Sequence, residues 1–228
     1  MAVRIVSYSQ PSNDFEDQGL ENIQDLIAFC ARVSNPSNQM NQETSEKLIK
    51  YLIKHAHWSP LEMVSACLEI DTTRDIAHQI VRHRSFAFQE FSQRYADPKE
   101  FGNQFVIRDA RLQDEKNRQN SIETDDLQLH AQWENQQRNV IDAAKKAYEW
   151  AIDNGIAKEQ ARAVLPEGNT KTRLYMNGTL RSWIHYIELR GANGTQKEHM
   201  DIAHACAKVI AEIFPLAEQL NVSNTGNT

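Results

Sequence analysis

The sequence predicts an α+β fold in which helices pack on a mainly antiparallel sheet. Three observations support this fold class. The chain has 228 residues and no Pro-, Gly- or Ser-rich linker, so we expect a single domain over residues 1–228 with one sizeable core. Hydrophobic residues make up 40% of the chain and charged residues 25%, which is typical of a folded protein. Strand and helix patterns do not alternate regularly, and no GxGxxG follows the first strand pattern, which argues against a doubly wound parallel sheet.

The first part of the chain contains two strand patterns and two clear helix patterns. Residues 3–9 alternate between apolar and polar side chains, and residues 63–70 are rich in β-formers, so both are expected to be strands. Apolar residues recur at helical spacing in residues 20–33 and again in residues 45–56. The break between this second helix and the second strand falls at Ser59-Pro60.

A third helix is expected over residues 72–84, with Thr72 as its N-cap. This assignment places Arg82, His83 and Arg84 in the last turn of the helix. Cations there complement the negative end of the helix dipole, so a purely structural interpretation of these three residues exists.

The second part of the chain begins with a long polar segment. Residues 108–137 are mixed in charge, and we expect a solvated excursion that becomes a helix. The helix pattern continues through residues 138–155 and ends at Gly155. A short helix, a strand and two further helices are then predicted, in this order: 158–166, 170–178, 179–191 and 195–215. Residues 221–228 are expected to form a flexible tail.

The composition limits the possible functions. The formal net charge is −6, which argues against a broad basic face that coats nucleic acid. The sequence contains no apolar run typical of a signal peptide or a membrane span, so we expect a cytoplasmic protein without membrane association. Cys30, Cys67 and Cys206 are widely spaced and lie in apolar segments, which suits buried free thiols. Neither the cysteines nor the histidines have metal-ligand spacing, so no metal is expected.

The segment from Arg82 to Tyr95, RHRSFAFQEFSQRY, concentrates three arginines and a histidine within an acidic protein. Arginine suits bidentate recognition of phosphate and carboxylate, so the cluster indicates a small anionic ligand. Four more arginines stand near predicted element ends: Arg162, Arg173, Arg181 and Arg190. Arg181 and Arg190 are nine positions apart on one predicted helix and so point in roughly opposite directions, at about 180°. That helix could therefore serve two pockets or two subunits.

The arginine cluster resembles the signature RHRxxxxxxxS of the flavin-dependent thymidylate synthases, with Ser92 at its end. The resemblance extends over nearly the entire chain and continues in family order. The segments that carry it are CARVSNP (30–36), HWSPLE (57–62), QIVRHR (79–84), EFSQRY (90–95), QARAVLP (160–166), LRSWIHYIELR (180–190), Gln196 and Glu198.

The resemblance implies a homotetrameric enzyme, with active sites shared between subunits, that methylates dUMP to dTMP. It also implies methylenetetrahydrofolate as carbon donor, FAD as hydride carrier and NADPH as reductant. Residues at family positions that contact FAD are Ser59, Arg82, His83, Arg84, Glu90, Thr179, Leu180, Arg181 and His185, and His57 matches a position near the flavin. Residues at family positions around dUMP are Gln79, Arg82, Glu90, Phe91, Ser92, Gln93, Arg94, Arg162 and Arg190.

We assign the chief catalytic role to Arg190. A guanidinium at the uracil edge would stabilise negative charge at N3 and O2 and make C5 a better nucleophile, without a covalent enzyme adduct. Attack by Ser92 on C6 is a weaker alternative, because a serine needs a general base and only His83 in the motif is an obvious one. We interpret Ser92 as a hydrogen-bond donor to the ligand.

Three positions depart from the family pattern: Met63 and Gly194, where histidine is frequent, and Thr179, where asparagine is common. Two other functions remain open. In a nucleic-acid-binding module Phe86, Phe88 and Phe91 would stack on bases, although packing in the core and beside the flavin is the simpler interpretation. A member of the same fold without catalysis could bind an anion only. The sequence leaves open the biological source, the folate-binding residues and the preference for NADPH or NADH.

Overall fold

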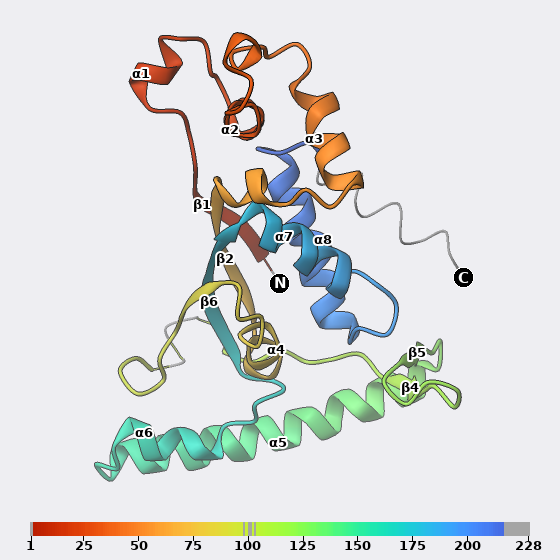
Figure 1. Ribbon diagram of the computed structural model, residues 1–228. Coiled ribbons are helices and arrows are strands. Elements are labelled where there is room, and N and C mark those ends of the chain that lie inside the picture. The colour runs from red at the N-terminus through yellow and green to blue at the C-terminus, as the bar shows by residue number, and fades with distance from the viewer. Residues whose placement is uncertain (1, 98, 100–101, 103, 217–228) are drawn as a thin grey trace.

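A four-stranded antiparallel sheet forms the centre of the computed structural model, which describes residues 2–97, 99, 102 and 104–216 (Figure 1). Its strand order is β1-β2-β6-β3. The strands are β1 (Ala2–Tyr8), β2 (Ser65–Thr73), β3 (Ala87–Glu90) and β6 (Lys171–Thr179). The expected α+β class with an antiparallel sheet is confirmed. The tail predicted at 221–228 lies outside the described residues. No helix in the described part of the chain is long and apolar enough to cross a membrane.

One face of the sheet is apolar and covered by helices. Along β6 every second residue is buried, including Leu174 and Met176, while Arg173 and Tyr175 face the other side. The helices α4 (Arg74–Ile80), α7 (Leu180–Arg190) and α8 (Lys197–Ala211) cover the apolar face and complete one continuous core. The opposite face carries cross-strand ion pairs instead, such as Arg173 with Asp71 at 2.7 Å.

The helices before β2 pack at one end of the sheet (Figure 1). They are α1 (Asn13–Glu16), α2 (Ile23–Ala31) and α3 (Ser45–Lys54), with 3-10 turns at η1 (Pro36–Asn38) and η2 (Ser59–Glu62). Ile27 of α2 and Ile49 of α3 are fully buried in the main core, as their helical spacing predicts. Both predicted helices are therefore confirmed. α2 is two or three residues shorter at each end than predicted, and α3 begins at the predicted Ser45 and ends two residues early.

Residues 108–137 are mostly exposed and become a helix, as expected, but they also form two short strands that were not predicted. They contain a small hairpin, β4 (Arg111–Gln113) and β5 (Ser121–Glu123), followed by the start of α5 (Leu127–Asp153). The helix begins at Leu127 because the Asp126 side chain accepts a hydrogen bond from the Leu129 N–H at 3.0 Å.

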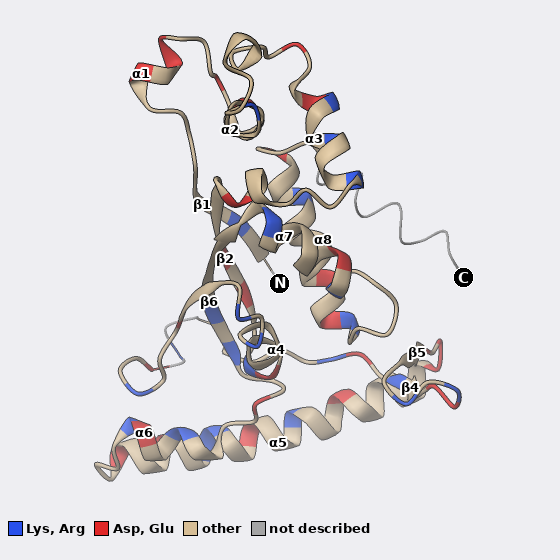
Figure 2. Cartoon of the chain, in the orientation of Figure 1, with Lys and Arg blue, Asp and Glu red and all other residues tan. Residues whose placement is uncertain are grey.

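The long helix α5 ends as expected, with Gly155 in the left-handed region at φ +75°. The short helix α6 (Lys158–Ala161) and the 3-10 turn η4 (Arg162–Val164) follow it and pack against it. Tyr148 and Leu165 belong to a second, smaller core at this end of the molecule. Acidic and basic residues are interspersed along α5 and α6 (Figure 2).

The helix expected at 72–84 is shorter at both ends, and this corrects the placement of the arginine cluster. Its N-cap is Thr73 rather than Thr72, because β2 continues its pairing with β6 through Thr73. The helix ends at Ile80, so residues 82–84 lie in the turn that follows it. The chain has to reverse there because the unpredicted strand β3 pairs with β6 from Ala87 onward.

The free thiols are less uniform than predicted. Cys206 is completely buried, and burial raises the pKa of its thiol far above the ordinary value. Cys30 and Cys67 are only half-buried, although burial also raises the pKa of each thiol. Raised pKa values disfavour the thiolate, so none of the three has the properties of a cysteine nucleophile.

Phe86 anchors the arginine-bearing turn to the core. Its ring lies 4.8 Å from that of Trp183 and 6.0 Å from that of Tyr186, both on α7. The interpretation of Phe86 as a packing residue is confirmed, because this ring is engaged inside the protein. Gly178 of β6 makes the approach possible, since a Cβ at that position would lie 2.4 Å from the Phe86 ring.

We predict that Gly178→Ala lowers the free energy of unfolding by about 1–3 kcal/mol, because the Phe86 ring is packed on several sides and cannot move away at low cost. Urea denaturation measures the change. Gly168→Ala is the matched control, because its added Cβ would meet no atom closer than 4.0 Å. Equal stability of the two variants would contradict the role assigned to Gly178.

Candidate active site

The N-terminus of α7 fixes the turn that carries Arg82, His83 and Arg84. Thr179, the last residue of β6, caps α7 by accepting a hydrogen bond from the Ser182 N–H at 3.3 Å. The Ser182 hydroxyl in turn donates to the Ser85 carbonyl at 3.2 Å. Leu180 is fully buried and its N–H donates to the Val64 carbonyl. Thr179 and Leu180 therefore have structural roles at this point of the fold.

Two of the three residues in the turn are free for a ligand. The side chains of Arg82 and Arg84 are exposed, and within the described ranges neither has a hydrogen-bond or ion-pair partner. His83 is half-buried, with its ring edge-on to the Tyr186 ring at 5.0 Å. The turn thus presents two guanidinium groups to solvent, with His83 between them anchored inside.

Arg190, at the last position of α7, contacts this turn directly. Its Nε donates a hydrogen bond to His83 Nε2 at 2.9 Å. Because Nε2 accepts, the neutral ring carries its proton on Nδ1. The terminal nitrogens of Arg190 have no partner in the part of the chain that the structure describes. His83 therefore orients the Arg190 guanidinium while leaving its terminal fork available.

Behind Arg190 lies a directional chain of hydrogen bonds that sequence reasoning did not find. His199 is fully buried on α8 and its Nε2 pairs with the Tyr186 hydroxyl at 3.1 Å. Its Nδ1 pairs with Gln79 Oε1 at 3.3 Å. Since the amide oxygen only accepts, His199 Nδ1 donates to it and Nε2 accepts from Tyr186. His199 is therefore a buried residue that also orients Gln79.

The series of hydrogen bonds continues from Gln79 through Gln196 to Glu198. Gln79 Nε2 donates to Gln196 Oε1 at 2.8 Å, and Gln196 Nε2 donates to Glu198 at 2.9 Å. Arg111 of β4 donates to the other Glu198 oxygen at 2.6 Å. Burial would raise the pKa of Glu198, but the hydrogen bonds from Arg111, the backbone and Gln196 outweigh it and the pKa is lowered. The ionised Glu198 thus holds the far end of the network.

Both histidines near Arg190 stay neutral. Burial, followed by the nearby charge of Arg190, lowers the pKa of His83 to about 4. Burial, with Arg190 and His83 as further causes, lowers the pKa of His199 to about 3. Burial also raises the pKa of Tyr186, which therefore keeps its proton. Arg190 is consequently the one cation of this group at neutral pH.

The predicted substrate residues 90–93 begin with Glu90, the last residue of β3, and continue past the strand. Glu90 accepts a hydrogen bond from the Thr172 hydroxyl at 2.9 Å and pairs with Arg74 at 3.4 Å. Phe91 extends the pairing, since its N–H donates to the Arg173 carbonyl. Gln93 is 2% exposed, and its amide nitrogen is buried without a hydrogen-bond partner in the described ranges. The Ser92 hydroxyl accepts from the Arg94 N–H at 3.4 Å.

Arg94 and Arg162 meet at the α6 end of the molecule. Arg94 Nε lies 3.6 Å from a Glu159 carboxylate oxygen, and Arg162 Nε donates to the Glu159 carbonyl at 3.3 Å. Figure 1 places α6 well apart from α7, which carries Arg190. A single chain therefore does not bring Arg162 to Arg190.

A third group of predicted site residues surrounds η2, apart from the group near Arg190 and the group near Arg162. Arg181 forms an ion pair with Glu62, and the His185 ring lies edge-on to Trp58 at 4.5 Å. Ser59 and His57 are exposed beside them, with the His57 ring 6.0 Å from that of Tyr51. The four predicted residues Ser59, Arg181, His185 and His57 thus share one region, at the opposite end of α7 from Arg190.

The departures from the family pattern have local explanations at two positions. Gly194 has φ +92°, a conformation that a side chain would strain, so histidine is disfavoured there. Thr179 supplies the cap of α7 with its hydroxyl. Met63 is 60% exposed and nothing in the structure explains it. The described residues contain no cluster of three or more His, Cys, Asp or Glu side chains able to hold a metal ion.

These features define a class of protein: an α+β domain with an antiparallel sheet and a turn that presents guanidinium groups to solvent. Residues 17–216 match the family described as "Thymidylate synthase complementing protein". The chain is 46% identical over 215 residues to a probable flavin-dependent thymidylate synthase of Paramecium bursaria Chlorella virus 1, covering 94% of this chain and 96% of that protein. It is 48% identical over 216 residues to the flavin-dependent thymidylate synthase of a Synechocystis species, with the same coverage of both chains.

A solved structure supports the same assignment. The UMP/dUMP methylase PolB from Streptomyces cacaoi, crystallised with 5-Br dUMP, superposes with a TM-score of 0.78 and 25% identity, covering 97% of this chain and 94% of PolB. The chain belongs to the flavin-dependent thymidylate synthase family, as the sequence motifs indicated.

We predict that the stability of the folded chain falls as the pH drops below 6.5. The unfolded chain binds protons at His199 there, whereas the folded chain resists protonation down to about pH 3. The slope from this buried histidine reaches up to about 1.4 kcal/mol per pH unit. His199→Asn, whose amide can still donate to Gln79, should flatten the profile measured by urea denaturation between pH 4 and 7. His55→Asn controls for loss of an exposed histidine, and an unchanged slope in His199→Asn would refute the assignment.

Proposed function

We propose that this chain catalyses the reductive methylation of dUMP to dTMP, with methylenetetrahydrofolate as carbon donor, FAD as hydride carrier and NADPH as reductant. The observation that carries the proposal is the Arg190 guanidinium, held through Nε by neutral His83 and free at its terminal nitrogens. The named relatives and the dUMP-methylating structural neighbour support the same reaction.

The residues of the arginine-bearing turn fit a flavin dinucleotide. Its pyrophosphate needs dense hydrogen-bond donors, and Arg82 and Arg84 are exposed and unpartnered within the described ranges. We assign FAD binding to Arg82, His83, Arg84 and Glu90 on one side. The second side comprises Ser59, Arg181, His185 and His57, with Thr179 and Leu180 holding the start of α7 behind them. Bound FAD would supply the hydride that completes the methyl group.

We assign dUMP to Gln79, Arg82, residues 90–94, Arg162 and Arg190. The buried and unpartnered amide nitrogen of Gln93 supports this, because a ligand acceptor would satisfy it. The orientation of Gln79 is fixed by His199 and Gln196 before any ligand arrives. Such preorganised polar groups favour binding because little reorganisation is needed.

The catalytic role of Arg190 follows from its charge and setting. A fixed cation at the uracil edge stabilises negative charge at N3 and O2, which makes C5 more nucleophilic. The neighbouring His83 and His199 remain neutral and do not compete for that charge. Ser92 acts in this scheme as a hydrogen-bond donor. His83 is unsuited as its general base, because Nε2 already accepts from Arg190 and Nδ1 carries the proton.

The active site is shared between subunits of a homotetramer in this proposal. Arg190 and Arg181 lie at opposite ends of α7, and Arg162 lies on the segment beside α6. A second subunit would place its own Arg162, with the residues around it, beside Arg190 of the first subunit. The exposed Trp133 and Trp150 on α5 are candidates for burial in the assembly, since large exposed apolar side chains mark interaction surfaces.

A visible absorption spectrum of the purified protein tests the function. We expect a flavin band that NADPH bleaches and dUMP perturbs, because both ligands share one centre. A colourless protein that takes up no added FAD would overturn the proposal.

We predict that Arg190→Ala reduces dTMP formation at least about 100-fold, as expected for loss of a preorganised charge at the reacting ring. Size-exclusion chromatography should show unchanged assembly. Arg138→Ala is the control, because among the described residues Arg138 pairs only with Glu134, on the exposed side of α5. Near-normal turnover in Arg190→Ala would remove Arg190 from the catalytic role.

A further inference from the structure

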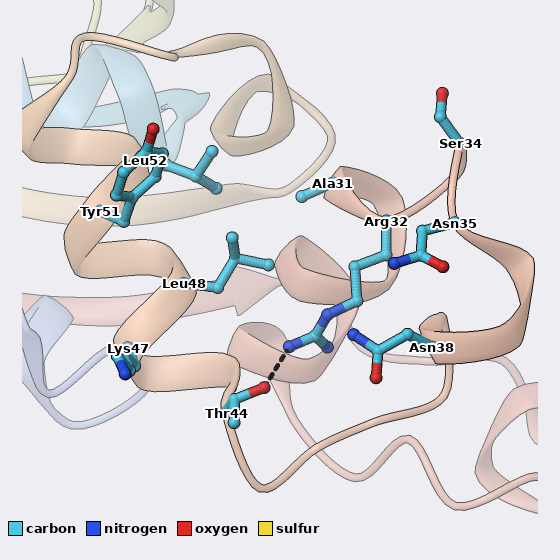
Figure 3. A pocket seen from close by; sticks show the side chains of 10 residues that line it. All are labelled: Ala31, Arg32, Ser34, Asn35, Asn38, Thr44, Lys47, Leu48, Tyr51 and Leu52. Atoms are coloured by element: carbon cyan, nitrogen blue, oxygen red, sulfur yellow. Dashed lines mark hydrogen bonds between the residues drawn. The ribbon is translucent and has the colours of Figure 1, made fainter.

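A hollow of about 560 Å³ lies between α2 and α3, outside the residues assigned above to FAD and dUMP (Figure 3). One wall comes from the segment 31–38, which includes most of the CARVSNP motif, and the other from α3. The motif belongs to the family resemblance, yet none of its residues has a ligand in the assignments above. The volume falls within the range of about 300–1,000 Å³ that is typical of small-molecule sites.

The hollow is positively charged. Arg32 is 7% exposed and donates to two neutral acceptors, the Asn41 carbonyl and the Thr44 hydroxyl, the latter at 2.8 Å. In the described part of the chain no carboxylate lies within ion-pair distance of Arg32 or Lys47. None of the described residues that line the hollow is acidic. A largely buried guanidinium without a counter-charge favours an anionic ligand, in a protein whose net charge is −6.

The remaining surface suits the body of such a ligand. Leu48, Tyr51 and Leu52 of α3 offer apolar area beside the cations, and Asn35 and Asn38 on the opposite wall offer amide groups (Figure 3). Apolar lining with a few polar groups is characteristic of ligand pockets. The N-cap Thr44 makes no side-chain cap hydrogen bond to the first turn of α3, and its hydroxyl accepts from Arg32.

The hollow adjoins the group proposed to hold the flavin. Tyr51 lines it, and the Tyr51 ring lies 6.0 Å from the His57 ring, two residues before Ser59. A molecule that occupies the hollow could therefore extend past Tyr51 toward the flavin. Two co-substrates of the proposed reaction have to meet the flavin, and both have a flat ring system and a remote anionic end.

We infer that the hollow binds the anionic end of such a co-substrate, with its phosphate or carboxylate groups at Arg32 and Lys47 and its adjoining apolar part on Leu48 and Tyr51. This inference rests on the proposed function. The anion is either the 2′-phosphate of the nicotinamide dinucleotide or the glutamate carboxylates of the folate, and the two sources are separable by experiment.

Lys47 is the residue to change, because Arg32 also ties α2 to the start of α3 and its loss would disturb the fold. Lys47 is exposed and lines the hollow. Lys50 provides the matched control: it lies one turn further along α3, is paired with Glu46 at 2.5 Å and does not line the hollow. Both Lys47→Gln and Lys50→Gln remove one positive charge from the same helix.

The test is equilibrium binding to the full-length, FAD-loaded protein, measured by isothermal titration calorimetry. The probes are NADP+, NAD+, tetrahydrofolate monoglutamate and tetrahydrofolate triglutamate. We expect Lys47→Gln to weaken one charged probe about 3- to 5-fold, the size typical of a partly exposed ion pair, and Lys50→Gln to weaken none. If Lys47→Gln loses affinity for NADP+ but not for NAD+, the 2′-phosphate is the anion in the hollow. If it loses affinity for tetrahydrofolate triglutamate but not for the monoglutamate, the glutamate carboxylates are the anion.

Two outcomes overturn the inference: unchanged affinity of Lys47→Gln for all four probes, or equal losses in both variants. Perturbation of the flavin spectrum by dUMP is the reference, and it should be the same in wild type and Lys47→Gln. If dUMP perturbs the wild-type spectrum and the probes bind both variants normally, only the hollow loses its assignment. If dUMP has no effect on the wild type, the proposed function itself fails.

Discussion

The pairing of β6 with its two neighbours is the constraint on which the site depends. Nine residues of β6 pair with β2, and the same strand pairs with β3 on its other edge. The strand runs directly into α7 through Thr179, so the sheet sets the position of Arg190 at the far end of that helix. Pairing with β3 forces the preceding chain to reverse, which places His83 against Tyr186 of α7. One strand therefore controls both halves of the Arg190–His83 contact.

Burial and hydrogen bonding together keep this region free of competing charge. His83 and His199 have lowered pKa values because burial and the Arg190 cation both disfavour their protonation. As neutral rings they can each donate and accept, and the order of donors from Tyr186 to Glu198 follows from that. A protonated His199 could not accept from the Tyr186 hydroxyl, and the orientation of Gln79 would lose its support.

The sequence could predict the elements with strong periodicity and the composition of the site, but not its assembly. The helices α2, α3, α7 and α8 show clear apolar spacing and were found. The strands β3, β4 and β5 have three or four residues, too few to show a period. α4 ends at Ile80 because the chain must turn there to let β3 pair with β6. Since β6 lies more than 80 residues further along the chain, no local pattern could reveal this end. Likewise, the partner of His199 at Gln79 is 120 residues away, so only the folded chain shows the contact.

Several arginines divide into two sets by their partners, although Arg181 and Arg94, assigned above to the ligands, pair with Glu62 and Glu159. Arg4, Arg74, Arg111 and Arg173 are paired with carboxylates between strands or between elements, and they hold the structure together. Arg82, Arg84 and the terminal nitrogens of Arg190 have no partner among the described residues, and Arg32 has only neutral ones. Arg173 stands near an element end as Arg190 does, yet its bond to Asp71 makes it structural. Position at a helix or strand end therefore does not separate the two sets. For the largely buried Arg32, the lack of a carboxylate partner is the stronger indication of a ligand, because a buried guanidinium is costly unless a counter-charge is supplied.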